Sequence, residues 1–228
     1  MNNDNTRYSR VAIVLHWAIA ALILANLVVG FVMEDLKGTL RGTVISFHIS
    51  SGITILALTV VRVIWRLTHT PPPHPSSMKP WERHAATLAH FALYLAMVLM
   101  PLTGWGIISA NPPIGSAGAT AVVAGQLGAK ADAADVRRSS RKAPRMVWGV
   151  IRLPEIGTLE RIGATPEGIP LQRAVHDDFV EFHSVGASLF IALLLLHLAA
   201  ALKHQFMDGE AEFARMGMGR ARPAGNGH

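Results

Sequence analysis

Two histidines inside one apolar stretch are the residues of this chain best suited to chemistry. His183 and His197 lie in the run FHSVGASLFIALLLLHLAAALKH, which covers residues 182–204. At about 100° per residue, an α-helix projects both side chains from the same face, and a rise of about 1.5 Å per residue separates them by roughly 21 Å. An ionisable group inside a membrane helix is costly and usually faces a partner. We therefore expect each imidazole to face another functional group.

The composition makes histidine the strongest ligand for a transition metal. The chain has 228 residues, with eleven histidines and no cysteine. This excludes disulfides, thiolate ligands, iron–sulfur clusters and covalent haem attachment through C-x-x-C-H. Half of the residues are apolar, and the mean hydropathy is +0.33. The net charge of +6 is more typical of membrane orientation than of nucleic-acid binding, because many Lys and Arg flank apolar runs.

Four apolar runs are long enough to cross a bilayer, at about 10–33, 43–67, 81–109 and 179–204. A signal peptide is the alternative for the first run. That run is longer than a typical signal h-region and lacks a convincing cleavage site, which favours a retained helix. The fold class is therefore all-α, an integral membrane four-helix bundle that forms a single domain over residues 1–228.

A long loop connects the third and fourth predicted helices. Residues 111–146 are rich in Ala, Gly and Ser without a clear period, which predicts a flexible insertion. Its basic run at 137–145 is typical of a solvated tract, and attraction of an anion such as superoxide is the alternative. Residues 146–156, MVWGVIRLPEI, are more apolar, and we expect them on the membrane surface.

The distribution of positive charge predicts the orientation of the bundle. An even number of helices places both termini on one side. The N-terminal tail, the proline-rich loop at 68–80 with its flanks, and the C-terminal tail are rich in Lys and Arg, whereas the first link carries only Lys37 and Arg41. Long loops count little in the positive-inside rule. Both termini are therefore predicted to be cytoplasmic, and the loop between the third and fourth helices extracytoplasmic.

This topology sorts four histidines into two pairs by depth. His16 and His197 lie near the cytoplasmic ends of their helices, and His48 and His183 lie near the outer ends. Each pair can supply the two axial imidazoles of a six-coordinate haem iron from facing helices of a bundle. A lone histidine in a membrane helix is more often a packing or pore residue, but four at matched depths favour haem. Small residues at 50–52 would let a flat ligand approach closely.

Several segments carry a resemblance to a known family: YSRVAIVLHW, SFHISSGITIL, VVRVIWRL, LAHFALYLAMVLMPLTGWGIISA, LPEI, FHSVGASLFIALLLLHLAAALKHQF and the trailing FARM. With them the chain resembles the bacterial cytochrome b561 family of small dihaem membrane cytochromes. By this resemblance, the family's four haem-ligand positions correspond to His16, His48, His183 and His197. The departures are the insertion at 111–146 and Gln205, where many relatives have a second histidine.

The resemblance implies a membrane-bound dihaem b-type cytochrome that carries out transmembrane electron transfer. The implied cofactors are two non-covalent haem b groups, with ubiquinone as the membrane partner. A redox partner, or superoxide, would meet the outer face, so the chain would be an electron carrier or a quinone-linked oxidoreductase. Two axial imidazoles leave no open position on iron, which favours electron relay over oxygen activation. The implied location is the bacterial inner membrane.

Other polar residues have weaker assignments. His90 also matches a family histidine, and it either lies beside a haem or quinone or packs with Tyr94. Haem propionates could pair with Arg10, Arg62 or Lys203, but these cations serve the positive-inside bias equally well.

Two rival functions remain. One is a cytochrome b subunit of a membrane dehydrogenase or hydrogenase complex, which would require a protein partner. The other is a metal-ion or proton transporter lined by histidine. A transporter should carry acidic residues within its helices, and these helix interiors have almost none.

Overall fold

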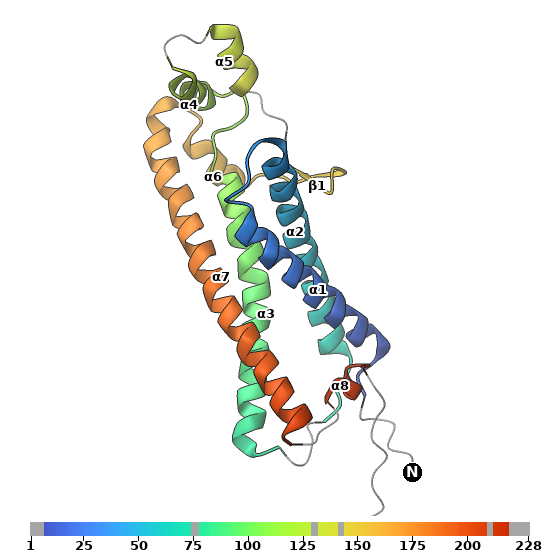
Figure 1. The fold of residues 1–228 in the computed structure, drawn as a ribbon. Coiled ribbons are helices and arrows are strands. Elements are labelled where there is room, and N and C mark those ends of the chain that lie inside the picture. The colour runs from blue at the N-terminus through green and yellow to red at the C-terminus, as the bar shows by residue number, and fades with distance from the viewer. Residues whose placement is uncertain (1–6, 74–77, 129–131, 141–143, 209–211, 219–228) are drawn as a thin grey trace, which may run out of the picture. The chain divides into compact units, whose positions relative to one another are not determined.

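A computed structural model describes residues 7–73, 78–128, 132–140, 144–208 and 212–218. It contains four long helices, α1 (Arg10–Val32), α2 (Gly38–Thr68), α3 (Pro80–Ser109) and α7 (Ile169–Phe206), shown in Figure 1. All four are long and apolar enough to cross a membrane. The all-α membrane helical bundle predicted from the sequence is confirmed.

The helix boundaries differ from the predicted ones where a helix continues beyond its apolar run of sequence. The bounds of α1 and α3 lie within one residue of those predicted, whereas α2 begins at Gly38 rather than 43 and α7 begins at Ile169 rather than 179. Hydropathy marks only the apolar part of a helix, so it misses polar extensions. Pro170 does not prevent the early start of α7, because a proline in the first helical turn gives up no helical hydrogen bond.

The chain divides into two compact units, and each long helix contributes residues to both. Unit 1 comprises Met1–Leu27, Thr54–Val98 and Ser188–His228. Unit 2 comprises Val28–Ile53 and Leu99–Ala187.

Unit 1 is built from the start of α1, the end of α2, most of α3 and the end of α7. Its buried side chains come from all four helices: Ile19, Ile23, Ile55, Thr59, Leu93, Met97 and Phe190. A short helix, α8 (Glu212–Arg215), lies at the start of α1. There the Tyr8 backbone N–H donates to the Arg215 carbonyl at 3.2 Å, and Trp17 Nε1 donates to the Met216 carbonyl at 2.9 Å. The two ends of the described chain therefore meet in this unit.

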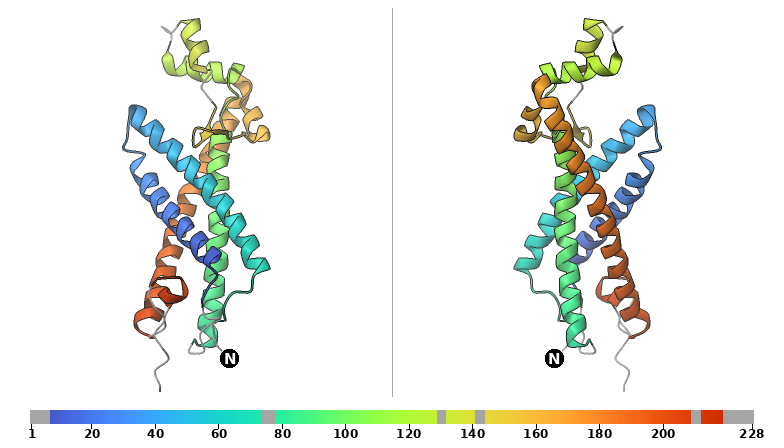
Figure 2. Two further views of the ribbon diagram at one scale, coloured as in Figure 1. Left: turned by 90° about the vertical axis from the view of Figure 1, so that its right-hand side faces the viewer. Right: turned by 90° about the vertical axis from the view of Figure 1, so that its left-hand side faces the viewer.

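Unit 2 contains the predicted insertion, which forms two helices, α4 (Ala117–Leu127) and α5 (Ala133–Ser140). Figure 2 shows α4 near the start of α7 and α5 packed against α4. Ser116 caps α4, because its Oγ accepts the Ala119 backbone N–H at 3.0 Å. Gly118 lies directly against the backbone of Gly163, where a larger residue has no room. Part of the segment is thus regular structure held by its caps and a glycine contact, and its flexibility stays a prediction.

The hairpin that follows the insertion lies beside the first half of α2 within unit 2. Strands β1 (Met146–Val147) and β2 (Ile151–Arg152) pair antiparallel, and α6 (Gly157–Ile162) and the 3-10 helix η2 (Pro166–Gly168) lead into α7. Trp148 and Gly149 form the turn with φ of 53° and 70°. The Trp148 backbone N–H donates to Ser50 Oγ at 2.8 Å, and its ring meets Phe47 edge-on at 5.6 Å. Membrane-surface placement of this hairpin stays a prediction.

The long helices carry apolar side chains on their outer faces. Large apolar residues more than 60% exposed occur on all four, among them Leu24, Val28, Leu67, Leu88, Phe91, Leu189, Leu195 and Leu196. Exposure of so many apolar side chains to water is unfavourable, whereas the hydrocarbon chains of lipid solvate them. These faces therefore contact the bilayer.

Candidate functional site

In unit 1, His16 of α1 and His197 of α7 face each other. Their ring centroids lie 6.5 Å apart, with an angle of 68° between the ring planes. His16 also meets the ring of Trp17 edge-on, at 5.0 Å between centroids. The structure thus brings together one of the two histidine pairs predicted from the sequence.

In unit 2, His48 of α2 and His183 of α7 face each other in the same way. Their ring centroids lie 6.1 Å apart, with 73° between the planes. The two pairs match the pairing predicted from helix depth, in which the fourth long helix, α7, contributes one residue to each pair. Their role as haem ligands stays a prediction.

Both separations suit two imidazoles that bind one metal from opposite sides. An imidazole nitrogen binds a metal at about 2 Å, and the ring centroid lies roughly 1 Å behind that nitrogen, so opposing ligands place their centroids roughly 6 Å apart. The described residues contain no group of three or more His, Cys, Asp or Glu that could hold a metal ion. Two nitrogens alone are a poor site for a bare ion, whereas haem brings its own four nitrogens. The donor set therefore fits haem.

Glycines of neighbouring helices let both rings of the unit 2 pair lie against helix backbone. A Cβ added at Gly30 of α1 would lie 3.5 Å from His48 Cε1, and one at Gly104 of α3 would lie 3.3 Å from His183 Cε1. The first distance is an ordinary contact and the second is tight. Gly186 of α7 packs against Met100, because an added Cβ would lie 2.8 Å from the Met100 sulfur. Sequence reasoning missed these glycine contacts.

A hydroxyl group adjoins the His183 ring. Thr103 Oγ1 lies 2.9 Å from His183 Nδ1 and 2.9 Å from the Met100 carbonyl oxygen. The sequence gives no signal for this contact, because a threonine in a membrane helix commonly bonds only to its own helix.

Arg62 is the cation associated with the unit 1 pair. Its Nε donates to the Tyr94 hydroxyl at 3.0 Å, and its Nη1 donates to the Ala12 carbonyl at 3.1 Å. The guanidinium is close enough to act electrostatically on both His16 and His197. Among the described residues, no Asp or Glu forms an ion pair with it. A charge in such apolar surroundings calls for an anion.

His90 lies against His197 rather than only against Tyr94. The rings of His90 and His197 meet edge-on with centroids 5.3 Å apart. His90 Nδ1 lies 2.7 Å from the Ala86 carbonyl oxygen, which can only accept, so this nitrogen carries a proton. Of the two roles open from the sequence, the geometry favours a position beside the candidate haem site.

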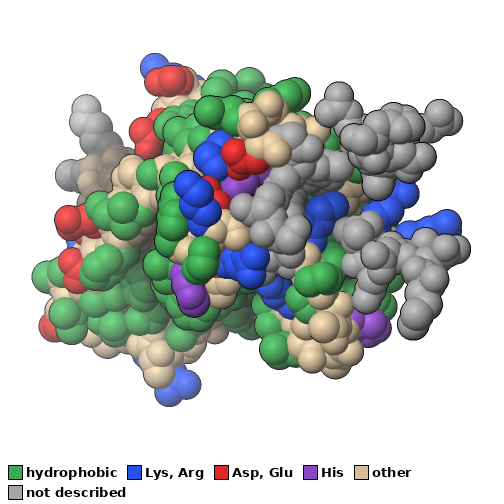
Figure 3. All heavy atoms as spheres, turned by 90° about the horizontal axis from the view of Figure 1, so that it is seen from below, with side chains coloured by type: hydrophobic (Ala, Val, Ile, Leu, Met, Phe, Trp, Pro, Cys, Tyr) green, Lys and Arg blue, Asp and Glu red, His purple; other side chains and the backbone are tan. Residues whose placement is uncertain are grey.

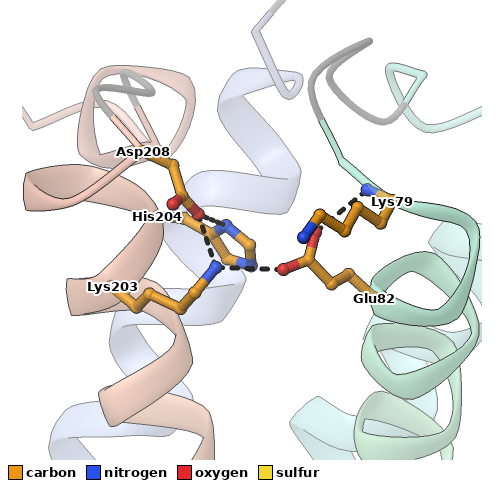
Figure 4. Close-up of polar contacts among 5 residues, drawn as sticks. All are labelled: Lys79, Glu82, Lys203, His204 and Asp208. Carbon is orange, nitrogen blue, oxygen red and sulfur yellow. Dashed lines mark hydrogen bonds and ion pairs between the residues drawn. The ribbon is translucent and has the colours of Figure 1, made fainter.

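Lys203 and Arg10, the other two cations considered as partners of haem propionates, contact groups outside the histidine pairs. Lys203 Nζ lies 3.0 Å from Glu82 Oε1 and 2.7 Å from Asp208 Oδ2, as Figure 4 shows. Asp208 also binds His204 Nδ1 at 2.7 Å. Arg10 lines a cavity of about 430 Å³ together with Arg7, Tyr8, Ile13, Val14 and Gly217. Neither histidine pair lines that cavity.

Lys203 of α7 connects Glu82 of α3 and Asp208 within unit 1. Figure 3 shows Lys, Arg, Asp, Glu and His side chains beside broad hydrophobic areas on the face seen from below. The hydrogen bond from Lys203 lowers the pKa of Asp208 below its usual range, and His204 adds to this. The network joins the start of α3 to the end of α7.

Comparison with known proteins gives consistent matches. A sequence model of the family described as prokaryotic cytochrome b561 matches residues 7–219. The chain is 31% identical over 112 residues to "Cytochrome b561 homolog 2" of Escherichia coli (strain K12), covering 48% of this chain and 59% of that protein. It is 35% identical over 108 residues to "Cytochrome b562" of Cereibacter sphaeroides, covering 43% and 66%. It is 26% identical over 106 residues to "Probable superoxide oxidase CybB" of Yersinia pestis, covering 45% and 58%. Each match spans less than two thirds of the relative's length.

Proposed function

The chain belongs to the prokaryotic cytochrome b561 family, and from this premise we propose that it is a dihaem cytochrome transferring electrons across the bacterial inner membrane. Membership makes it a bacterial multi-pass membrane protein of electron transfer that uses haem b. The observation that carries the dihaem proposal is the presence of one facing histidine pair in each unit, at 6.5 and 6.1 Å.

The histidines would hold the two haems without covalent attachment. His16 and His197 would bind one iron, and His48 and His183 the other. A bound haem supplies reversible one-electron oxidation and reduction of its iron. If both histidines of a pair held one iron, they would leave no position for oxygen, so the protein scaffold would favour electron relay. The apolar helices exclude water from the rings and so keep the iron sites in a low-dielectric environment.

Arg62 would bind a haem propionate in unit 1. The support is a cation beside His16 and His197 that has no carboxylate partner among the described residues. Lys203 is the weaker candidate, because Glu82 and Asp208 already neutralise it. The carboxylate of the cofactor would supply the anion that the protein does not.

The orientation follows from charge. The start of α1 and the end of α7 belong to unit 1, together with the proline-rich loop and its flanking Lys and Arg. The positive-inside rule then assigns the termini to the cytoplasm and the loop between α3 and α7 to the outer side. Residues 1–228 would act as one domain.

Quinone and an outer redox partner complete the proposed route. Ubiquinone would exchange electrons with the protein inside the membrane, as the family resemblance implies. Superoxide is the proposed outer substrate, with support from the similarity to the probable superoxide oxidase of Yersinia pestis. The positively charged segment at 137–145, of which residues 141–143 lie outside the described part of the chain, would attract that anion.

Haem content tests the dihaem proposal. The purified protein should be red, and acid acetone should extract all of its haem, in an amount of two haems per chain. A colourless protein, a single haem, or haem that stays with the polypeptide would contradict the proposal.

A further inference from the structure

The hydroxyl of Thr103 forms a hydrogen bond with His183 from a different helix. In the described part of the chain, and leaving His48 aside, no other side chain forms such a bond to a histidine of either pair. We propose that Thr103 is a positioning residue that holds His183 in the tautomer able to bind iron. This inference rests on the proposed role of His183 as a haem ligand. The contact spans two helices, since Thr103 lies on α3 and His183 on α7.

Proton counting identifies the tautomer. A threonine hydroxyl has one proton to donate and two lone pairs that accept. The carbonyl oxygen of Met100 can only accept, and it lies 2.9 Å from Thr103 Oγ1, so the hydroxyl proton points to it. The remaining contact, 2.9 Å between Thr103 Oγ1 and His183 Nδ1, then requires a proton on the nitrogen. His183 therefore donates from Nδ1.

The opposite assignment leaves two oxygens in conflict. If the hydroxyl donated to Nδ1, Thr103 Oγ1 and the Met100 carbonyl would face each other at 2.9 Å with no proton between them. Two acceptors at that distance repel each other inside an apolar helix bundle. The Nδ1–H tautomer satisfies both contacts at once.

A proton on Nδ1 leaves the lone pair on Nε2, which is the nitrogen free to bind a metal. In a neutral imidazole only one nitrogen carries a hydrogen. A hydrogen-bond acceptor on the distal N–H of a ligating histidine fixes the ring and increases its basicity toward the metal. Gly104, the next residue of α3, lies against Cε1 of the same ring. Thr103 and Gly104 thus constrain His183 by a hydrogen bond and by close packing.

The unit 1 pair lacks this arrangement, which provides an internal reference. In the described part of the chain, His16 and His197 contact aromatic rings and lie within the electrostatic reach of Arg62, and neither contacts a hydroxyl. Loss of the Thr103 hydroxyl should therefore affect one haem and leave the other unchanged.

The experiment compares Thr103→Val, which removes the hydroxyl at nearly constant volume, with Thr103→Ser, which restores it. Thr59→Val is the matched control, because Thr59 is fully buried and its hydroxyl binds the Met97 sulfur at 3.8 Å. Redox titration of the full-length haem protein measures both midpoint potentials.

Without the hydrogen bond to Thr103, the His183 imidazole is a weaker donor and stabilises ferric iron less, so Thr103→Val should raise one midpoint potential. It should also accelerate loss of that haem by about 10-fold. Thr103→Ser and Thr59→Val should behave as wild type.

A second readout needs no variant. In the reduced protein, where bis-histidine iron is low-spin and diamagnetic, nitrogen-15 labelling of histidine should show a hydrogen-bonded Nδ1–H for His183. Absence of that resonance in the wild type would overturn the inference, as would unchanged potentials in Thr103→Val with two haems still bound. If His183→Ala retained both haems with unchanged spectra, the proposed ligand role itself would fail.

Discussion

The imidazole rings of His48 on α2 and His183 on α7 lie 6.1 Å apart between centroids, each against a glycine of a neighbouring helix. The rings of His16 and His197 face each other at a similar centroid separation of 6.5 Å. One helix, α7, supplies a histidine to each pair. A change on α7 should therefore act on one site at a time.

Alanine substitutions should sort the four histidines into two classes. His48→Ala and His183→Ala should disturb the same haem, and His16→Ala and His197→Ala the other, because each pair would hold one iron. Redox titration with optical spectra of each purified variant measures this. If His16→Ala and His48→Ala removed the same haem, the pairing would be wrong.

The two glycines that face histidine rings should differ in their tolerance of alanine. A Cβ at Gly104 would lie 3.3 Å from His183, so Gly104→Ala should displace the ring and destabilise the protein by about 1–3 kcal/mol. Gly30→Ala places its Cβ at an ordinary 3.5 Å from His48 and serves as the matched control. Thermal unfolding and the haem spectrum report both effects. Equal behaviour of the two variants would contradict the packing argument.

Removal of the cation beside the unit 1 pair should lower the potential of one haem. Arg62→Gln takes away a positive charge that favours the reduced iron, so the midpoint potential of the haem bound by His16 and His197 should fall. Arg62→Lys should retain most of the effect, and Arg10→Gln should leave both potentials unchanged. A potential that does not move in Arg62→Gln would show that Arg62 does not act on the cofactor.

The ion pairs at the end of α7 should make stability depend on pH in the acid range. The hydrogen bond from Lys203 lowers the pKa of Asp208 in the folded protein. The stabilisation is therefore present above the pKa of Asp208 in the unfolded chain and is lost as pH falls through the folded value. Thermal unfolding of wild type and Asp208→Asn should differ at pH 6 and converge below about pH 3. A difference that grows with acidity would refute this sign.

Hydropathy was sufficient to predict the four spans, because each span depends on one helix at a time. Depth along each helix then sorted the four histidines into the two pairs whose rings face each other in the structure. The contacts of Thr103, Gly104 and Gly30 depend on which helix faces which, and no local pattern encodes that. The early start of α7 was missed because its first turns are polar. Trp148 at φ 53° was missed because a left-handed tryptophan contradicts local preference and is stabilised by Ser50.

Electron transfer between the two sides of the membrane tests the central claim most directly. The protein would be reconstituted in vesicles with an electron donor on the outer side only, and both haems would be followed by stopped-flow spectroscopy. We predict that both haems become reduced and that a water-soluble ubiquinone analogue then reoxidises them within seconds. His48→Ala and His183→Ala should block reduction of the haem bound by His16 and His197 while leaving it in place. Reduction of that haem in either variant at the wild-type rate, or haems that quinone cannot reoxidise, would contradict a quinone-linked route through both sites.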